Sequence, residues 1–416
     1  MESRETNIVS KFKYIIIFAL VYFFSPNGLS SLPNLSISYL LKDVFKLTAT
    51  QAAYFGAISI LGWAIKPLWG LISDLFPIKG SRRRNYLILT SLVASFCWLI
   101  LALTSNYNVW LLLLILTFSS FAYAFQDVVT DAYMVEIGKK ENKLREFQSV
   151  QWLAVSLARI ITGVAGGLAA AKLSYQTTFG IAFFFPLIVA VISYLLLKDE
   201  PETIIRFQEF KNVFKTAFLN KDFLLVTLAL FLWNFLPSFG IPFFYYMVDE
   251  LKFSKILIGT LNSISAIGSA IGAMIFGSFL RRVNFKKLFI FSILISSIGT
   301  FFVLIYLTDF VKNNHTLAVV LSIFDRIVFG ALGMIAFLTM LTLAAQKTES
   351  LVAGSMFAFV TSIINLASMG SGFLGGYLYS KIGLGPLIVV SAVTSLMILI
   401  FVPFLKLEDN EENFRS

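Results

Sequence analysis

Two carboxylates stand one helical turn apart within an apolar stretch that is long enough to cross a membrane. Asp127 and Asp131 are four residues apart, so a helix places both on one face, with Thr130 between them. A carboxylate at membrane depth is costly unless it faces protein or water, which makes each aspartate a candidate functional residue. We predict that one of them carries a proton, and both are also candidate substrate contacts. The alternative is a structural pair that neutralises an intramembrane arginine.

A polar stripe follows the next apolar segment. Its members recur at helical spacing: Gln148, Trp152, Ser156, Arg159 and Gly163. Arg159 keeps its charge and can bind a carboxylate with two parallel hydrogen bonds, which suits an anionic substrate. Trp152 is a further candidate substrate contact on this stripe. A permanent salt bridge from Arg159 to Asp127 or Asp131 is the alternative.

Three more charged residues lie within apolar segments. Lys66 precedes Pro67, where a helix should bend, and is a candidate substrate contact. The alternatives are that its long stem carries the charge toward the membrane surface or that it pairs with a neighbouring helix. Asp325 and Arg326 are adjacent, so they point about 100° apart on a helix and cannot pair cleanly. At least one of them should reach another helix.

The segment around residues 233–245 carries the marks of a broken helix. Pro237, Gly240 and Pro242 interrupt it, and irregular backbone at membrane depth is tolerated where it lines a polar interior. Asn234 is a candidate substrate contact here, and the neighbouring aromatic rings could stack on a flat heterocycle. Lipid exposure is the alternative for any single ring, since the chain has 44 Phe.

Composition identifies the environment in which these residues act. Of the 416 residues, 58% are hydrophobic and 13% are charged, whereas a soluble domain has about 25% charged residues. A soluble enzyme, a disulfide scaffold, a disordered chain and a coiled coil are excluded. The single cysteine, Cys97, cannot form an intramolecular disulfide, and the single histidine, His315, rules out a histidine metal cluster. The chain is an integral membrane protein.

The apolar stretches predict an all-α membrane protein with twelve transmembrane helices in two six-helix halves. The expected spans are residues 12–41, 50–73, 85–104, 109–137, 148–171, 176–197, 223–247, 256–280, 288–308, 316–345, 350–380 and 384–405. The break at Pro26-Asn27-Gly28 should kink the first span. A charged loop divides the chain into an N-terminal bundle (1–197), an inter-bundle loop (198–222) and a C-terminal bundle (223–416).

Basic residues set the expected orientation. Most of the 33 Lys and Arg fall in one set of alternating loops and at the termini, which the positive-inside rule places in the cytoplasm. The opposite loops hold only Lys42, Lys46, Lys172, Lys252, Lys255, Lys312 and Lys381. The net charge of +10 therefore orients loops at a lipid bilayer and implies no nucleic-acid partner.

Marker residues recur between the two expected halves. Gly70 and Gly277 each end an even-numbered span before an arginine-rich loop, and Gly163 and Gly370 lie in the fifth and eleventh spans. Both pairs are 207 residues apart. A parallel repeat of six spans is typical of the major facilitator architecture, which holds its substrate at the membrane midplane between the halves.

One segment carries a specific resemblance. From Trp63 to Leu89 the chain reads WAIKPLWGLISDLFPIKGSRRRNYLIL. The frame of Gly70, Asp74 and Arg82-Arg83-Arg84 resembles the facilitator-superfamily motif between the second and third spans. The longer form, with its Lys-Pro and Phe-Pro pairs, resembles the folate–biopterin transporter family.

The resemblance continues through the fourth and fifth spans. Gln126-Asp127-Val128-Val129-Thr130-Asp131-Ala132 and Glu136 are similar to that family's acidic signature, and Gln148-Ser149-Val150-Gln151-Trp152 extends the match. The resemblance implies import of folates or pterins, coupled to protons. The muropeptide permeases share a looser acidic signature, and a permease for muropeptides or for other organic anions of the same superfamily is the alternative.

The charged residues at the ends of spans two to four form the expected gate. Asp74, Arg82, Arg83, Arg84 and Glu136 lie near the inner face, where a charge network can stabilise one conformer of an alternating-access cycle. Lys139 and Lys140 lie beside Glu136 and could pair with it.

The sequence lacks the signature motifs of several other protein classes. No Walker A sequence, metal-ligand cluster, H-E-x-x-H motif or nucleophile elbow is present, so we expect no enzyme, no cofactor and no metal. A channel is disfavoured because the sequence shows two halves with gate-like inner loops and no segment that resembles a selectivity filter. The expected protein is a monomeric secondary transporter in a plasma or inner membrane, or in an organelle membrane.

Overall fold

The computed structural model describes residues 2–141, 143–198, 211–212, 215, 220–278, 280, 283–346 and 353–405. Within these ranges the chain is helical, with one isolated bridge between Ile78 and Ser81 and no strand. The main long helices are α1 (Glu2–Phe24), α6 (Arg84–Leu103), α7 (Val109–Lys140), α8 (Leu144–Lys172), α9 (Tyr175–Leu196), α13 (Lys255–Ser278), α14 (Phe285–Phe302), α16 (His315–Gln346), α17 (Ala353–Ile382) and α18 (Leu384–Met397).

Ten helical stretches of the described chain are long and apolar enough to cross a membrane. The other two expected spans are present as interrupted helices. The span expected at 50–73 consists of α3 (Ala49–Ser59), α4 (Leu61–Ala64) and α5 (Lys66–Leu75). The span expected at 223–247 consists of α11 (Lys221–Asn234) and α12 (Gly240–Asp249). The all-α membrane fold is therefore confirmed, and the predicted bends fall where prolines interrupt the helices.

The first span is also broken, as its sequence predicts. α1 ends at Phe24 and is followed by η1 (Leu29–Ser31), α2 (Asn34–Tyr39) and η2 (Leu40–Val44). At the break the chain turns back so closely that a Cβ on Gly28 would meet the carbonyl groups of Tyr22 and Phe23. Glycine permits this approach, which leaves the peptide and side chain of Asn27 free to bind other groups.

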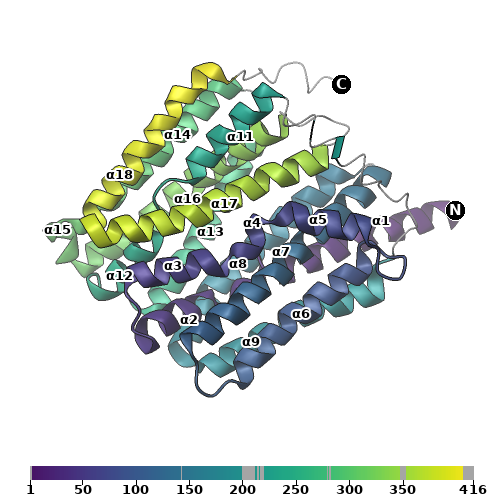
Figure 1. The fold of residues 1–416 in the computed structure, drawn as a ribbon, viewed down its shortest axis with the longest axis horizontal. Coiled ribbons are helices and arrows are strands. Elements are labelled where there is room, and N and C mark those ends of the chain that lie inside the picture. The colour runs from purple at the N-terminus through teal and green to yellow at the C-terminus, as the bar shows by residue number, and fades with distance from the viewer. Residues whose placement is uncertain are drawn as a thin grey trace.

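The helices form two groups (Figure 1). In the first, α6 packs against α7 and α9, and α1 packs against α8 and α9. In the second, α14 packs against α16 and α18, and α11 packs against α17. Each group has its own core of buried apolar side chains, with Ile17, Phe18 and Val129 in the first and Phe223, Phe289 and Leu343 in the second. The start of α1 and the end of the segment η5 (Ile398–Phe404) lie at the same end of the bundle.

Small residues bring the two groups together along two interfaces. α8 packs against α13, where Ser263 accepts a hydrogen bond from the Val164 amide at 2.8 Å and donates one to the Ile160 carbonyl at 2.6 Å. A Cβ on Gly163 would meet Ser263 and the Gly259 carbonyl. In the second interface α3 packs against α17, and Thr50 donates to the Gly376 carbonyl at 3.1 Å.

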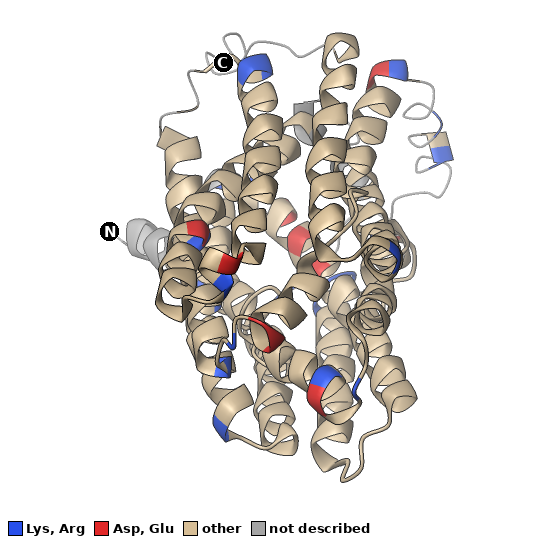
Figure 2. Ribbon diagram, turned by 90° about the vertical axis from the view of Figure 1, so that its left-hand side faces the viewer, with Lys and Arg blue, Asp and Glu red and all other residues tan. Residues whose placement is uncertain are grey.

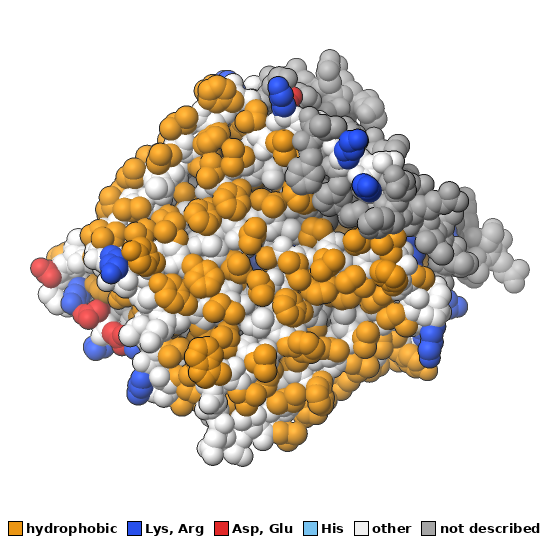
Figure 3. Space-filling view, viewed as in Figure 1, with side chains coloured by type: hydrophobic (Ala, Val, Ile, Leu, Met, Phe, Trp, Pro, Cys, Tyr) orange, Lys and Arg blue, Asp and Glu red, His pale blue; other side chains and the backbone are white. Residues whose placement is uncertain are grey.

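The surface and the charge distribution agree with a membrane setting. Figure 3 shows broad hydrophobic faces over the helices, with charged side chains gathered at their margins. Figure 2 shows that most helical positions carry neither charge, while a few charged positions occur near mid-length. Exposed apolar side chains such as Phe96, Leu114 and Tyr194 are typical of helices that face lipid.

Candidate functional site

Lys66 and Asp127 form an ion pair inside the first helix group. Lys66 begins α5, just after the break at Ile65, and its Nζ lies 2.5 Å from Oδ2 of Asp127 in α7. Both side chains are largely buried, with 13% and 9% exposure. The Lys66 ammonium also lies 4.8 Å from the centre of the Trp63 ring. The structure therefore shows Lys66 paired with a neighbouring helix, one of the outcomes that the sequence left open.

Asp131 lies one turn further along α7, and its carboxylate accepts hydrogen bonds from neutral side chains instead of forming an ion pair. Its Oδ1 accepts a hydrogen bond from the Tyr22 hydroxyl at 2.6 Å and one from the Gln151 amide at 3.3 Å. Within the described residues no basic side chain lies within 4 Å of this carboxylate, so both of its protein partners are neutral. A carboxylate in such a setting can take up a proton without breaking an ion pair.

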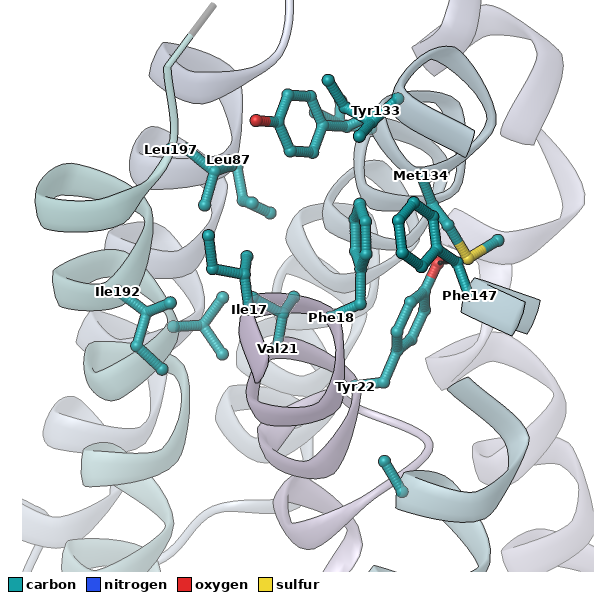
Figure 4. Close-up of a cluster of buried hydrophobic side chains, with 14 of the residues drawn as sticks. Ile17, Phe18, Val21, Tyr22, Leu87, Tyr133, Met134, Phe147, Ile192 and Leu197 are labelled. Atoms are coloured by element: carbon teal, nitrogen blue, oxygen red, sulfur yellow. Dashed lines mark hydrogen bonds between the residues drawn. The ribbon is translucent and has the colours of Figure 1, made fainter. Parts of the chain in front are cut away.

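The position of Tyr22 follows from the packing of α1. Its ring lies in the buried cluster with Val21, Phe18 and Met134, shown in Figure 4. The rings of Phe18 and Phe147 are 5.0 Å apart, which fixes this face of α1 against α8. The hydroxyl of Tyr22 therefore reaches Asp131 from a rigid apolar base.

Arg159 lies close to the same carboxylates but is not paired with them. Its Nε donates to the Asn27 carbonyl at 3.1 Å, and the Asn27 amide donates in turn to Asp127 Oδ1 at 3.4 Å. In the part of the chain that the structure describes, no carboxylate lies within 4 Å of the guanidinium, and the residue is exposed. The salt bridge to Asp127 or Asp131 that the sequence allowed is thus not formed here.

These residues form one polar group, called here the charge cluster. It consists of Tyr22, Asn27, Lys66, Asp127, Asp131, Gln151 and Arg159. Four separate segments supply it: the broken first span, α5, α7 and α8. Its two ends differ in chemistry, since one offers a carboxylate with neutral partners and the other a guanidinium with free donors.

Two other expected contacts lie outside this cluster. Trp152 is 37% exposed, and its ring packs edge-on against Phe337 of α16 at 6.2 Å. Asn234 donates from its amide to the Leu230 carbonyl at 2.8 Å and contacts Met340 Sδ at 3.1 Å. Trp152 therefore lies where α8 approaches the second helix group, and Asn234 is held within that second group.

The residues expected to form a gate gather at the end of the bundle where α5 ends. Arg83 lies 2.7 Å from Asp74 Oδ1 and 2.6 Å from Glu136 Oε1, and its Nη1 donates to Ser73 at 2.8 Å. Arg84 donates to the Tyr194 carbonyl at 2.7 Å. This end, called here the Arg83 end, carries an ion-pair network that joins α5 to α7. Arg82 follows the same turn in the chain and also has interaction partners.

The opposite end of the bundle, called here the Lys42 end, carries ion pairs between the two helix groups. Lys42 Nζ lies 2.6 Å from Asp249 Oδ1 and 4.9 Å from the centre of the Tyr245 ring. Lys255 lies 3.5 Å from Asp43 Oδ2. Tyr245 donates to the Leu47 carbonyl at 2.8 Å. The first span and α12 are thus tied together at this end.

Several of these residues were not identified from the sequence. Contacts described above are made by Tyr22, Asn27, Gln151, Lys42 and Asp249, and helical spacing along the chain predicts none of these pairings. Gln151 belongs to the Gln148–Trp152 motif, but its position along α8 says nothing of its distance from Asp131 in α7. Asp249 lies 207 residues after Lys42, the same offset as the glycine markers, which was the available signal.

The helices are arranged as in solved membrane transporters that have the major facilitator fold. The nucleoside transporter NupG superposes with a TM-score of 0.69 at 15% identity, covering 96% of this chain and 99% of the other. A D-xylose–proton symporter superposes with a TM-score of 0.70 at 12% identity, covering 97% of this chain and 99% of the other.

The chain belongs to the BT1 family, whose model matches residues 27–411. It is 31% identical over 407 residues to the folate-biopterin transporter of Synechocystis sp., covering 94% of this chain and 81% of that protein. It is 30% identical over 411 residues to putative folate transporter 2 of Plasmodium berghei, covering 94% and 88%. The family resemblance inferred from the Trp63–Leu89 motif and the acidic signature is therefore confirmed, and the protein is a transporter, not an enzyme.

Proposed function

We propose that this protein imports folates or related pterins across a membrane by proton symport with alternating access. The observation that carries the proposal is the charge cluster, where Asp131 has only neutral hydrogen-bond partners and Arg159 has no carboxylate partner among the described residues. A coupled proton needs a carboxylate that can take it up, and an organic anion needs a cation that can bind it. The relatives named as folate or folate-biopterin transporters support the substrate class.

Asp131 is the proposed proton carrier, in preference to Asp127. Asp127 is tied to Lys66 at 2.5 Å, so protonating it would leave a buried ammonium without its counter-charge. Asp131 would keep the Gln151 hydrogen bond in the deprotonated form and could turn its own proton toward a neighbour when protonated. Asp127 then serves to hold Lys66 near the substrate.

Arg159 is the proposed grip on the substrate carboxylate. Its Nε is held by Asn27, which leaves the guanidinium nitrogens at its tip to form the two parallel bonds that a carboxylate accepts. Trp152 and Trp63 offer exposed or partly exposed aromatic faces on which a flat heterocycle can stack. Lys66 and Asn234 are further proposed contacts, supplied by α5 and α11.

The two ends of the bundle are the proposed gates. Ion pairs between the helix groups close the Lys42 end in this conformer, and we place that end outside the cell, as the distribution of basic residues favours. At the cytoplasmic end the Asp74–Arg83–Glu136 network holds α5 to α7. We propose that this network, with Arg82 and Arg84, stabilises one conformer and releases during the cycle.

Uptake into liposomes tests the function. Purified protein should accumulate labelled folic acid, 5-formyltetrahydrofolate or biopterin when the lumen is alkaline relative to the outside. A proton ionophore should abolish accumulation above equilibrium, while saturable exchange persists. A muropeptide in excess serves as competitor, since a permease for muropeptides is the alternative. Inhibition by the muropeptide with no uptake of any pterin would reverse the assignment.

A further inference from the structure

Arg326 is a membrane-depth cation that the charge cluster does not include. It lies in α16 of the second helix group and is 28% exposed. Its Nε is 3.9 Å from Asp325 Oδ2, which is too long for a hydrogen bond. Among the residues that the structure describes, the guanidinium donates no hydrogen bond. Its ion pair with Asp325 is therefore loose, and an arginine at this depth with exposed surface and no hydrogen-bonded partner among the described residues is a functional candidate.

The contacts of its helix show which way Arg326 faces. Gly333 and Phe337 follow it by seven and eleven residues, so all three share one face of α16. Open space surrounds the position of a Cβ on Gly333, and Phe337 is 36% exposed and packs against Trp152 of the first helix group. Arg326 therefore points toward the first group and not into the packed interior of the second.

Asp325 faces elsewhere. It shares its face with Phe329, four residues later, whose ring lies 5.3 Å from Phe302 at the end of α14. Its side chain is 16% exposed, less than that of Arg326. Asp325 thus lies against the second group's own helices, and its carboxylate does not occupy the face that Arg326 presents.

Two helix crossings set the depth of Arg326 relative to Arg159. In the antiparallel pair α8 and α13, Ser263 bonds to the backbone of Ile160 and Val164, which places Arg159 about level with residue 266. In the parallel pair α13 and α16, a Cβ on Gly268 would meet the Arg326 and Ile327 carbonyls. The two arginines are therefore level to within about one helical turn, ~5 Å, one on each side of the line where the groups meet.

We propose that Arg326 binds a second carboxylate of the substrate, so that Arg159 and Arg326 together select dicarboxylate ligands. This inference rests on the proposed function and deepens it: a pterin conjugated to a glutamate-like tail carries two carboxylates, and one arginine from each helix group can bind each. A substrate held by both groups also links binding to their relative movement. A ligand with one carboxylate would use one of the two arginines, and a ligand with none would use neither.

Binding to purified protein tests the proposal with three ligands: folic acid, a folic acid amide that has lost one of its two tail carboxylates, and biopterin. Arg326→Gln should weaken folic acid binding about 5- to 150-fold, the scale of a lost charge-assisted hydrogen bond. The affinity for the folic acid amide should fall much less, and the affinity for biopterin should not change. Asp325→Asn is the matched control, since it removes a charge from the neighbouring position on the other face and should spare the preference for two carboxylates.

The outcomes separate this inference from the proposed function. Wild-type protein that binds none of the three ligands contradicts the proposed function itself. Wild-type binding with equal losses for all three ligands in Arg326→Gln overturns only the second-carboxylate assignment. If Arg326→Gln does not fold, Arg326→Lys keeps the charge but not the planar fork, and it should reduce the preference for folic acid over the amide. An unchanged preference in Arg326→Lys would likewise overturn the assignment.

Discussion

Asp131 and Arg159 carry opposite charges in one polar group without forming a pair with each other or with other described residues. Neutral groups hold both of them: Tyr22 and Gln151 bind the carboxylate, and the Asn27 carbonyl binds the guanidinium. Lys66 and Asp127, by contrast, satisfy each other at 2.5 Å. Among the described residues the Asp131 carboxylate and the Arg159 guanidinium therefore have no oppositely charged partner. The proposed roles of Asp131 in proton binding and of Arg159 in anion binding give two predictions at the scale of single residues.

Asp131→Asn should separate exchange from accumulation. The amide can still accept from Tyr22 but cannot release a proton, so counterflow exchange should persist while uptake driven by a pH gradient is lost. Both activities are measured in the same liposome preparation. Asp127→Asn is the comparison, and it should lower folded yield because it leaves the Lys66 ammonium buried without its counter-charge. Gradient-driven accumulation by Asp131→Asn would remove this residue from the coupling mechanism.

Arg159→Lys should weaken binding of substrates that carry a carboxylate tail. An ammonium cannot form the planar pair of bonds, and the expected loss is about 1–3 kcal/mol, or roughly 5- to 150-fold in affinity. Biopterin, which has no tail, should lose far less. Titration of purified protein with both ligands measures the difference. If folate and biopterin lose affinity equally, Arg159 is not the substrate cation.

At the scale of the helices, chain breaks and close contacts at glycine residues position the side chains of the charge cluster. The break after Phe24 presents Asn27 to Asp127 and Arg159, and the break at Ile65 starts α5 with Lys66 beside α7. Along α8 and α13 the backbones approach so closely that only glycine fits at position 163. The close approach fixes the level of Arg159, since Ser263 bonds to the backbone one residue beyond it.

Gly163→Ala should destabilise the crossing of α8 and α13. The added methyl group would meet Ser263 and the Gly259 carbonyl, and overpacking of this kind costs about 1–3 kcal/mol. The melting temperature of detergent-solubilised protein should fall. Gly277→Ala is the matched control within α13, because nothing lies within 4 Å of a Cβ there. It should leave the melting temperature unchanged or raise it, and equal melting temperatures for the two variants would contradict the steric argument.

At the scale of the whole molecule, the two ends of the bundle use charge differently. The Arg83 network joins helices of one group, whereas the Lys42 pair joins the two groups. Its members, Lys42 and Asp249, are 207 residues apart, the offset shared by Gly70 and Gly277. The pair thus joins one residue of each helix group at the separation that the glycine markers share.

Charge reversal at the Lys42 end should shift the population of conformers. Lys42→Asp places two carboxylates together and should open this end, while the double variant with Asp249→Lys restores an ion pair and should close it again. Spin labels at Val44 and Asn313, both exposed, measure the separation in a Cys97→Ser background. The single variant should populate longer distances than the wild type. Distances that remain short in the single variant would exclude a closing role for this pair.

The proposed orientation of the protein in the membrane gives a separate prediction. Cysteine at Glu146, near the Arg83 end, and at Asn313, near the Lys42 end, should label from opposite faces of the membrane in a Cys97-free background. Asn313 should react with an impermeant reagent added outside intact cells, and Glu146 only after permeabilisation. Both positions are exposed, whereas Ser81 in the Arg83-end loop is buried and would report poorly. Labelling of both from outside would overturn the topology.

Local features of this protein were predictable from its sequence because they depend on local chemistry. Apolar length determines where a helix can cross a membrane, and the backbone restrictions of proline determine where it breaks, as at Pro26, Pro67 and Pro237. Helical spacing alone placed Asp127 with Asp131, and Trp152 with Arg159, on shared faces. The residue types capable of proton and anion chemistry were identified for the same reason.

The partners of these residues were decided by the tertiary structure alone. Lys66 bonds to Asp127 across 61 positions, Tyr22 to Asp131 across 109, and Lys42 to Asp249 across 207. Helical periodicity encodes none of these pairs, because they depend on which helices pack together and at what level; only the offset of the Lys42 pair matches the 207-residue spacing of the glycine markers. Glycine contacts and helix breaks set those levels, so the sequence by itself determined which groups could do the chemistry, and packing decided which were neutralised and which stayed free.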